Sequence, residues 1–182
     1  NVTRAIILLG FQRVKYIAMT ASVMQAMGNS RFSSFNYKGF WLHSLATGLA
    51  ADALARRMAP DWSEDAMAAG LLHDVGKLAL SMCLKDHWIP LIAKAKSGEG
   101  CLIRDLEQQA LGFDHAEAGS WLAERWRLPP SICQSIRYHH QPSQATSAED
   151  LVHVIHLSDV LSRGLRLGDP GDALIPKVDE EV

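Results

Sequence analysis

The sequence predicts an all-α fold, and three features of its 182 residues support this expectation. Apolar residues recur at helical spacing in nearly every segment, no segment shows convincing strand alternation, and Gly, Pro, Asn and Ser gather between the periodic stretches. The composition, with 48% hydrophobic and 21% charged residues, is typical of a globular protein, and the length allows a substantial core.

The chain divides into four expected parts: a helical segment over residues 1–27, a connecting loop over 28–39, a helical core over 40–168 and a loose, acidic tail over 169–182. The first part should form two helices interrupted at Gly10-Phe11. Helices in the core are expected over residues 40–58, 64–75, 77–84, 87–96 (interrupted near Pro90), 102–111, 114–126, 130–138 and 149–165.

Several helix ends carry their own signals. Ser63 is a plausible N-cap for the helix over 64–75, whose first turn is acidic, and Gly76 is expected to end that helix. Asp114 is placed to cap the helix that contains His115, and Pro130 suits the first turn of the next helix.

Composition also excludes several classes of protein. The net charge is −2 without a Lys/Arg run, so no nucleic-acid footprint is visible, and no apolar stretch resembles a membrane span or a signal peptide. Three widely spaced cysteines without a CxxC pair fit a reducing cytoplasm. No phosphate-binding loop, dinucleotide fingerprint, HExxH or GxSxG motif is present. The chain starts at Asn1 in helical register, as expected of a fragment or a processed protein.

The most informative feature is His73-Asp74 in the run LLHDVGKLAL, together with histidines and an aspartate elsewhere in the chain. The ordered series is His43, His73, Asp74, His115, His139, His140 and Asp159. Imidazole and carboxylate ligands suit a divalent transition metal, and a carboxylate can bridge two ions. Because each member falls near the end or on the inner face of an expected helix, the series predicts a metal site gathered from several helices.

Each member also has a plain structural explanation. His43 could be a core histidine with one backbone hydrogen bond, and His139-His140 could interact with the dipole at a helix C-terminus. A buried Asp74 needs a partner, which Lys77 could supply as a salt bridge; alternatively, Lys77 could hold a phosphate oxygen beside a metal.

Asp159 likewise lies among apolar positions and calls for a partner. The candidates on its own helix are His156, His153 and Arg163, the last at the i+4 position.

Four blocks of the chain resemble the HDOD domain, a bacterial all-α relative of the HD and HD-GYP phosphohydrolases. They are FWLHSLATGLAADALAR, AGLLHDVGKLAL, LGFDHAEAGSWLAERWRLPPSICQSIRYHHQP and VIHLSDVLSR, and the upstream AIILLGFQRVKYIAMTASVM is similar to a further block. The resemblance implies a multi-helix, HD-domain-like bundle over 40–168. It also implies that 1–27 is the C-terminal part of an N-terminal helical subdomain whose remainder is missing.

The resemblance further implies roles for the series. His43, His73, Asp74 and Asp159 match the positions that hold one metal in HD proteins, and His115 with His139 or His140 match those that hold a second in HD-GYP enzymes, with Asp74 as the bridge. Lys77 matches the lysine that faces substrate phosphate, so Asp74 and Lys77 are the implied catalytic pair.

Two departures weaken a cyclic dinucleotide phosphodiesterase interpretation. Gln141-Pro142 stands where the Gly-Tyr-Pro block would follow, and Gly39 stands where HD-GYP proteins often place an acidic ligand.

The leading hypothesis is therefore a cytoplasmic bacterial signal-transduction module that works with other signalling domains or proteins, without turnover. On this hypothesis the domain could bind a small phosphate-containing ligand and one or two ions of Fe, Mn, Ni or Zn. The alternative is a metal-dependent phosphohydrolase acting on a nucleotide or phosphodiester. A third hypothesis is a metal-free internal hydrogen-bond network left from such an enzyme.

Overall fold

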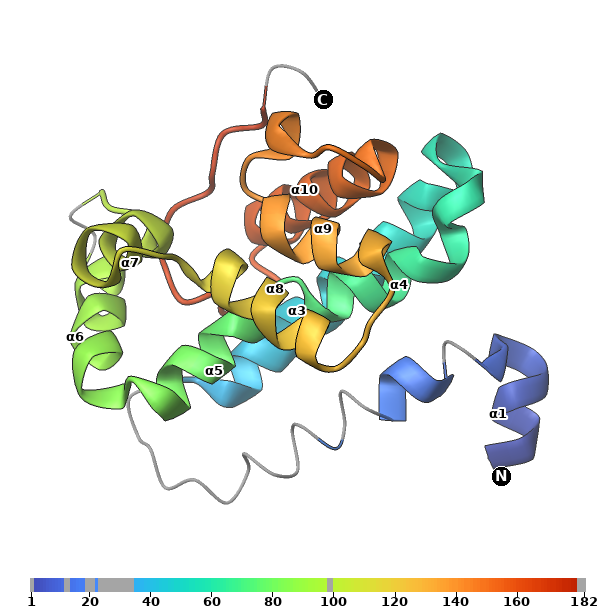
Figure 1. The fold of residues 1–182 in the computed structure, drawn as a ribbon, viewed down its shortest axis with the longest axis horizontal. Coiled ribbons are helices and arrows are strands. Elements are labelled where there is room, and N and C mark those ends of the chain that lie inside the picture. Colours follow the sequence, from blue (N-terminus) through green and yellow to red (C-terminus); the bar gives the residue numbers. More distant parts are fainter. Residues whose placement is uncertain (1, 12–13, 19–21, 23–34, 98–99, 180–182) are drawn as a thin grey trace.

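A computed structural model describes residues 2–11, 14–18, 22, 35–97 and 100–179 of the chain. Its helices are α1 (Val2–Leu9), α3 (Tyr37–Met58), α4 (Ser63–Leu72), α5 (Val75–Cys83), α6 (Lys85–Lys96), α7 (Ile103–Leu111), α8 (His115–Arg125), α9 (Pro130–Tyr138) and α10 (Glu149–Gly164), with 3-10 turns at Pro60–Trp62 and Pro142–Gln144 (Figure 1). The described ranges contain no strand, which confirms the all-α prediction.

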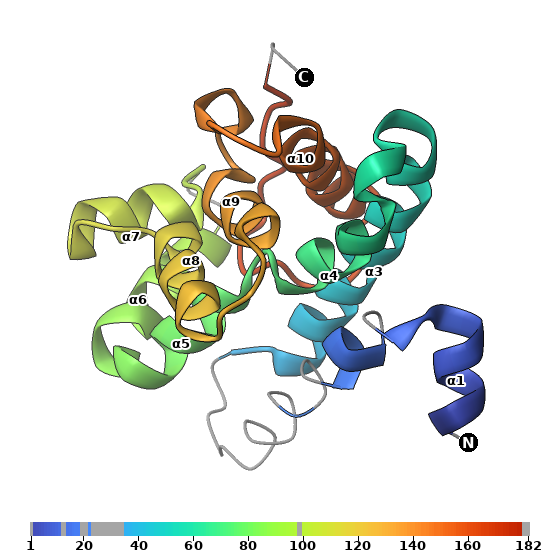
Figure 2. The same cartoon turned by 45° about the vertical axis from the view of Figure 1, so that its right-hand side comes forward.

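The long helix α3 packs against α4 and α10, and α5 packs against α8, which in turn contacts α9. The pair α6–α7 lies at one end of the molecule and α1 at the other, with α5 and α8 between α6–α7 and the larger group of α3, α4, α9 and α10 (Figures 1 and 2). After α10 the chain runs back between α6–α7 and α9–α10 (Figure 1). This arrangement brings the ends of several helices to the middle of the molecule.

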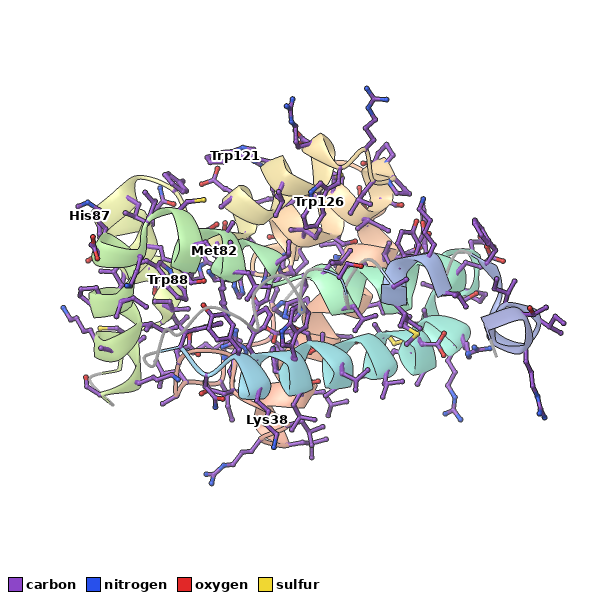
Figure 3. The ribbon with its side chains drawn as sticks, turned by 90° about the horizontal axis from the view of Figure 1, so that it is seen from below. Lys38, Met82, His87, Trp88, Trp121 and Trp126 are labelled. Atoms are coloured by element: carbon purple, nitrogen blue, oxygen red, sulfur yellow. The ribbon has the colours of Figure 1, made fainter. Side chains whose placement is uncertain are left out.

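Aromatic side chains form part of the core at the α6 end. Trp88 is fully buried, and its ring lies 5.4 Å from that of Phe35, which also contacts Phe40. Lys38 and Trp121, by contrast, point outward from opposite edges of the molecule (Figure 3). Burial of large apolar side chains such as Trp88 supplies the main driving force that fixes α6 and α7 on the rest of the domain.

The N-terminal prediction can be checked in part. Helix α1 ends at Leu9, and Gly10 has a φ of 86°, a left-handed conformation that ends a helix readily when the residue is glycine. Residues 14–18 are helical again and Tyr16 is buried, whereas most of the remaining predicted segment lies outside the described residues. Residues 28–34 of the predicted loop also lie outside the described residues. Helix α3 begins at Tyr37, before the predicted end of the loop, because the Asn36 side chain accepts a hydrogen bond from Gly39 N and caps the helix.

Three expectations about helix ends and interruptions in the core differ from the structure. Helix α4 stops at Leu72, and Gly76 lies inside α5, so the prediction that Gly76 ends a helix is wrong. Glycine is needed at position 76 because α5 and α8 cross closely there, and a Cβ on Gly76 would overlap the carbonyl oxygen of His115. Pro90 lies inside an uninterrupted α6, and Ser63 is the first residue of α4 rather than its cap.

The predicted start of α8 is confirmed, because Asp114 is its N-cap and accepts from Glu117 N. Helix α9 begins at Pro130, as expected. Among the described residues, no helix combines the length and the apolar character that a membrane crossing requires.

Candidate metal centre

The structure brings all seven predicted ligands together in the middle of the bundle. They come from five elements: α3 supplies His43, the α4–α5 break His73 and Asp74, the start of α8 His115, the end of α9 His139 and His140, and α10 Asp159. All except the half-buried His140 are at most 1% exposed. Adjacent residues in a continuous helix diverge by about 100°, so the break at His73-Asp74 allows both side chains to reach one site.

Asp74 lies between two groups of potential ligands. Its Oδ2 is 3.3 Å from His73 Nε2 and 3.8 Å from His43 Nε2, whereas its Oδ1 is 3.2 Å from His115 Nε2 and 3.6 Å from His139 Nε2. Ligand atoms within each group, the second of which also includes His140, lie within 4.8 Å of one another. One oxygen of Asp74 therefore faces each group, which is the geometry of a bridging carboxylate.

Buried atoms without hydrogen-bond partners point to a cation at this place. His43 Nε2, His73 Nε2, His139 Nε2 and Asp74 Oδ1 have no such partner in the described part of the chain. His73 Nδ1 donates to Gly70 O at 2.7 Å and His139 Nδ1 donates to Ile136 O at 2.8 Å, because a carbonyl can only accept. When these rings are neutral they present their Nε2 lone pairs to a carboxylate, so the cluster needs a donor hydrogen or a metal ion to satisfy its acceptors.

The charge balance agrees with this interpretation. The buried Asp, Glu, Lys and Arg residues among those described are Asp74, Glu107, Asp159, Asp172, Lys77 and Arg163, which is an excess of two negative charges. Uncompensated buried charge is costly, so two further positive charges would balance the site. One divalent ion could supply both.

Without a metal, protonated histidines would supply the positive charge that balances the buried carboxylates. Burial opposes the charged form of His73, but Asp74 raises its pKa to about 9, and Glu107 likewise raises the pKa of His115 to about 9 against burial. Burial lowers the pKa of His139 to about 4, so this ring stays neutral and able to bind a metal. Burial also disfavours the Asp74 carboxylate, yet Lys77 and His73 hold its pKa well below the usual value.

Glu107 is a member of the site that the sequence did not indicate. It is fully buried on α7, and its Oε2 lies 2.5 Å from His115 Nδ1 and accepts from His115 N at 2.9 Å, while Oε1 accepts from Trp88 Nε1 at 2.6 Å. A carboxylate behind a histidine fixes its orientation and raises its basicity toward a metal. Glu107 stands in the polar run RDLEQQAL, where nothing distinguishes it from an exposed residue.

Asp159 is shared between the cluster and an arginine. Arg163 Nε donates to both of its oxygens at 2.9 and 3.0 Å, and His43 Nε2 lies 3.0 Å from Oδ1. The alternative partner His156 is wrong, because its Nδ1 donates to His139 O and its Nε2 accepts from Asp179 N. Asp159 Oδ1 also lies 3.6 Å from His73 Nε2, so Asp159 borders the first ligand group, and its role as a ligand stays a prediction.

Lys77 forms the predicted salt bridge, with Nζ 2.7 Å from Asp74 Oδ2, and donates also to Pro170 O at 2.7 Å. Its suggested contact with phosphate stays a prediction. The tail that carries Pro170 is not loose where it begins: Asp169 N donates to Gly39 O, and Asp172 is buried against Arg163, with 2.6 Å between Oδ1 and Nη1.

An all-helical bundle with His and Asp side chains gathered around His73-Asp74 places the chain in the class of HD-related domains. The HDOD domain family model matches residues 1–142, and the chain belongs to this family.

Several solved structures are similar to the chain, among them the following two. An HDOD domain protein from Geobacter sulfurreducens superposes with a TM-score of 0.80 at 25% identity, over 98% of this chain and 59% of that one. The response regulator MmoQ from Methylococcus capsulatus str. Bath has a TM-score of 0.58 at 25% identity, over 93% and 73% of the two chains. An uncharacterized protein of Treponema pallidum (strain Nichols) is 27% identical over 161 residues, which is 87% of this chain and only 30% of that protein.

Proposed function

We propose that this chain is a signal-transduction module of the HDOD type whose core holds a divalent transition-metal ion on Asp74 without turning over a substrate. The observation that carries the metal is the convergence of unpartnered Nε2 atoms on a carboxylate in a region with two excess negative charges. Nitrogen and oxygen ligands in this mixture suit Fe, Mn, Ni or Zn.

The two ligand groups would bind a metal ion from opposite oxygens of Asp74. His43 and His73 would bind from the Oδ2 side of Asp74, and His115, His139 and His140 from the Oδ1 side. One divalent ion balances the buried charge, whereas a second ion would need additional anionic ligands, such as hydroxide or phosphate.

The burial of the centre supports a role without turnover. A catalytic metal keeps one position open to water and substrate, yet Asp74, His73 and His139 are fully buried. The lysine implied for substrate phosphate, Lys77, is also fully buried and already engaged by Asp74 and Pro170. Similarity to the response regulator MmoQ supports a place in signalling, with other signalling domains or proteins as partners.

Metal content of the purified protein tests the proposal. Elemental analysis of protein prepared without chelators should find about one divalent ion per chain, lost in Asp74→Ala and kept in the matched control Asp150→Ala, whose carboxylate is exposed in the first turn of α10. Metal-free wild-type protein would favour an internal polar network instead. Metal retained in Asp74→Ala would place the ion elsewhere and refute the assignment.

The bridging position of Asp74 also supports a second candidate, a metal-dependent phosphohydrolase. Two ions about 3.5–4 Å apart on one carboxylate could activate a water and stabilise a leaving oxygen. Lys77 and one histidine of the 139–140 pair would then hold the phosphate. Hydrolysis of bis(p-nitrophenyl) phosphate by the metal-loaded protein, abolished in a folded Asp74→Ala variant, would favour this candidate over the module without turnover.

A further inference from the structure

A cavity of about 570 Å³ lies between the end of α10 and the segment 168–175. It is lined by Ser162, Arg163 and Arg166 together with the apolar side chains Leu167, Leu174 and Ile175. Small-molecule sites in proteins have volumes of about 300–1,000 Å³ and combine apolar walls with a few polar groups that orient the ligand. None of the histidines of the metal centre lines this cavity.

Two of the lining residues have buried polar atoms without a hydrogen-bond partner among the described residues. They are Ser162 Oγ and Arg163 Nη2, on side chains that are 1% and 5% exposed. The other guanidinium nitrogens of Arg163 are used, since Nε donates to Asp159 and Nη1 to Asp172. Buried donors are nearly always satisfied in native proteins, so an unpartnered hydroxyl and an unpartnered Nη2 beside one cavity call for a partner other than the described residues.

The charges at the cavity favour an anionic partner. Its acidic lining residues are engaged: Asp169 accepts from Lys96 Nζ at 2.7 Å, and Asp172 accepts from Arg163 and from Ile103 N at 3.1 Å. The lining carries two arginines and two aspartates, but Arg166, in contrast to the aspartates, is exposed at the cavity and forms no ion pair with the described residues. A guanidinium binds phosphate and carboxylate oxygens with strong, directional hydrogen bonds.

We propose that this cavity binds a small organic anion with a phosphate or carboxylate head and an apolar body. The head would contact Arg166, the free Nη2 of Arg163 and the Ser162 hydroxyl, and the body would pack on Leu167, Leu174 and Ile175. This site is separate from the metal centre and would serve as an input to the module.

Arg163 links this input to the metal centre. The same guanidinium that would bind the ligand holds both oxygens of Asp159, which lies 3.0 Å from His43 Nε2. An anion on the free Nη2 would share the positive charge of Arg163 with Asp159 and would leave this carboxylate freer to join His43 and His73 around a metal ion. Because coupling between two binding sites is reciprocal, the anion should raise metal affinity and the metal should raise anion affinity. This linkage, unlike the cavity site itself, rests on the proposed function.

Isothermal titration of the metal-free full chain tests the site without involving the metal. Phenyl phosphate and benzoate carry a head and an apolar body, inorganic phosphate has the head alone and phenol has the body alone. We expect phenyl phosphate or benzoate to bind, and both the isolated head and the isolated body to bind more weakly. Whether phenyl phosphate or benzoate binds more tightly distinguishes a phosphate ligand from a carboxylate ligand.

Variants locate the binding. Arg166→Gln and Ser162→Ala should each weaken it by about tenfold, the loss expected for one charge-assisted or buried hydrogen bond. Arg57→Gln is the matched control, because Arg57 is exposed and lies about 27 Å along α3 from Gly39, next to which segment 168–175 begins. Absence of binding by every probe, or equal affinity in Arg166→Gln and Arg57→Gln, would overturn the proposal.

A metal titration with and without the tighter probe then tests the linkage. A higher metal affinity in the presence of the probe supports it, and an unchanged affinity refutes the role of Arg163 as the link. The anion titration uses metal-free protein, so its result does not depend on whether Asp74 holds a metal ion. The metal proposal and the cavity proposal can therefore be refuted independently.

Discussion

Alanine at position 76 is expected to force helices α5 and α8 apart. A Cβ at this position would overlap the carbonyl oxygen of His115 and lie 2.6 Å from the backbone nitrogen of Gly119, where ordinary Cβ contacts are 3.4–4 Å. Both neighbours are backbone atoms, which cannot rotate away as a flexible side chain can. The two helices must therefore separate by on the order of 1 Å along a tightly packed crossing.

Overpacking of this kind costs about 1–3 kcal/mol, and a clash with backbone belongs at the upper end of that range. Alanine regains about 1 kcal/mol through its higher helix propensity, so the free energy of unfolding should fall by about 2 kcal/mol. For a chain of this length, such a loss lowers the melting temperature by about 4–8 °C. Gly164→Ala is the matched control, since Gly164 is the last residue of α10 and a Cβ there meets no atom within 4 Å.

Urea unfolding of the metal-free proteins, followed by circular dichroism, measures both variants. Gly164→Ala should be neutral or more stable by up to about 1 kcal/mol, which makes the difference between the two variants about 2–3 kcal/mol. If Gly76→Ala proved as stable as Gly164→Ala, the close crossing of α5 and α8 would be wrong. Since His115 begins α8, the displaced helix should also lower metal retention.

Three other changes test the electrostatics of the centre. Glu107→Gln removes the carboxylate behind His115 and should weaken metal binding by about 10–100-fold in competition with a fluorescent chelator, whereas Glu124→Gln, exposed on α8, should not. In the metal-free protein the pKa values of His73 and His115 are raised from 6.5 to about 9, so these groups contribute stability below pH 6.5 that is lost as the pH rises through 9. The melting temperature should therefore fall across that interval, and a rise would contradict the assignment. Removal of the metal at pH 7 should destabilise the protein, by about 2.7 kcal/mol when the free ion had been at 100 times its dissociation constant.

Helical periodicity was sufficient to predict the fold class and the positions of most core helices, because each amphipathic segment carries its own pattern. Glycine was less informative. Gly76 could mark a helix end or a close contact between helices, and the two roles look alike until His115 is placed against it. The same ambiguity affects Gly168, where a Cβ would overlap His43 N and Gly39 O, so the turn after α10 is seated tightly on α3.

The ordered His and Asp series could be predicted because imidazole and carboxylate side chains are the ligands that a divalent transition metal prefers. The supporting carboxylates could not be predicted in this way. Glu107 occurs in a polar run and Asp172 in the Pro- and Gly-containing segment that was expected to be loose, and only the docking of α7 and of the C-terminal segment buries them. Long-range packing decides whether an acidic residue is solvated or holds a buried histidine or arginine.

The buried charges also bear on the choice between a regulatory module and an enzyme. One divalent ion neutralises the excess of two negative charges, and no further carboxylate is buried in the described part of the chain. A second ion would bring two positive charges that an incoming anion would have to offset, and Lys77, the cation nearest to Asp74, is already neutralised by it. Two-metal hydrolysis would therefore need an incoming anion besides the carboxylates that the described residues supply, whereas those carboxylates would balance a single divalent ion on their own. The buried charges thus agree with the proposed single ion, with anion binding as the event proposed to change its state.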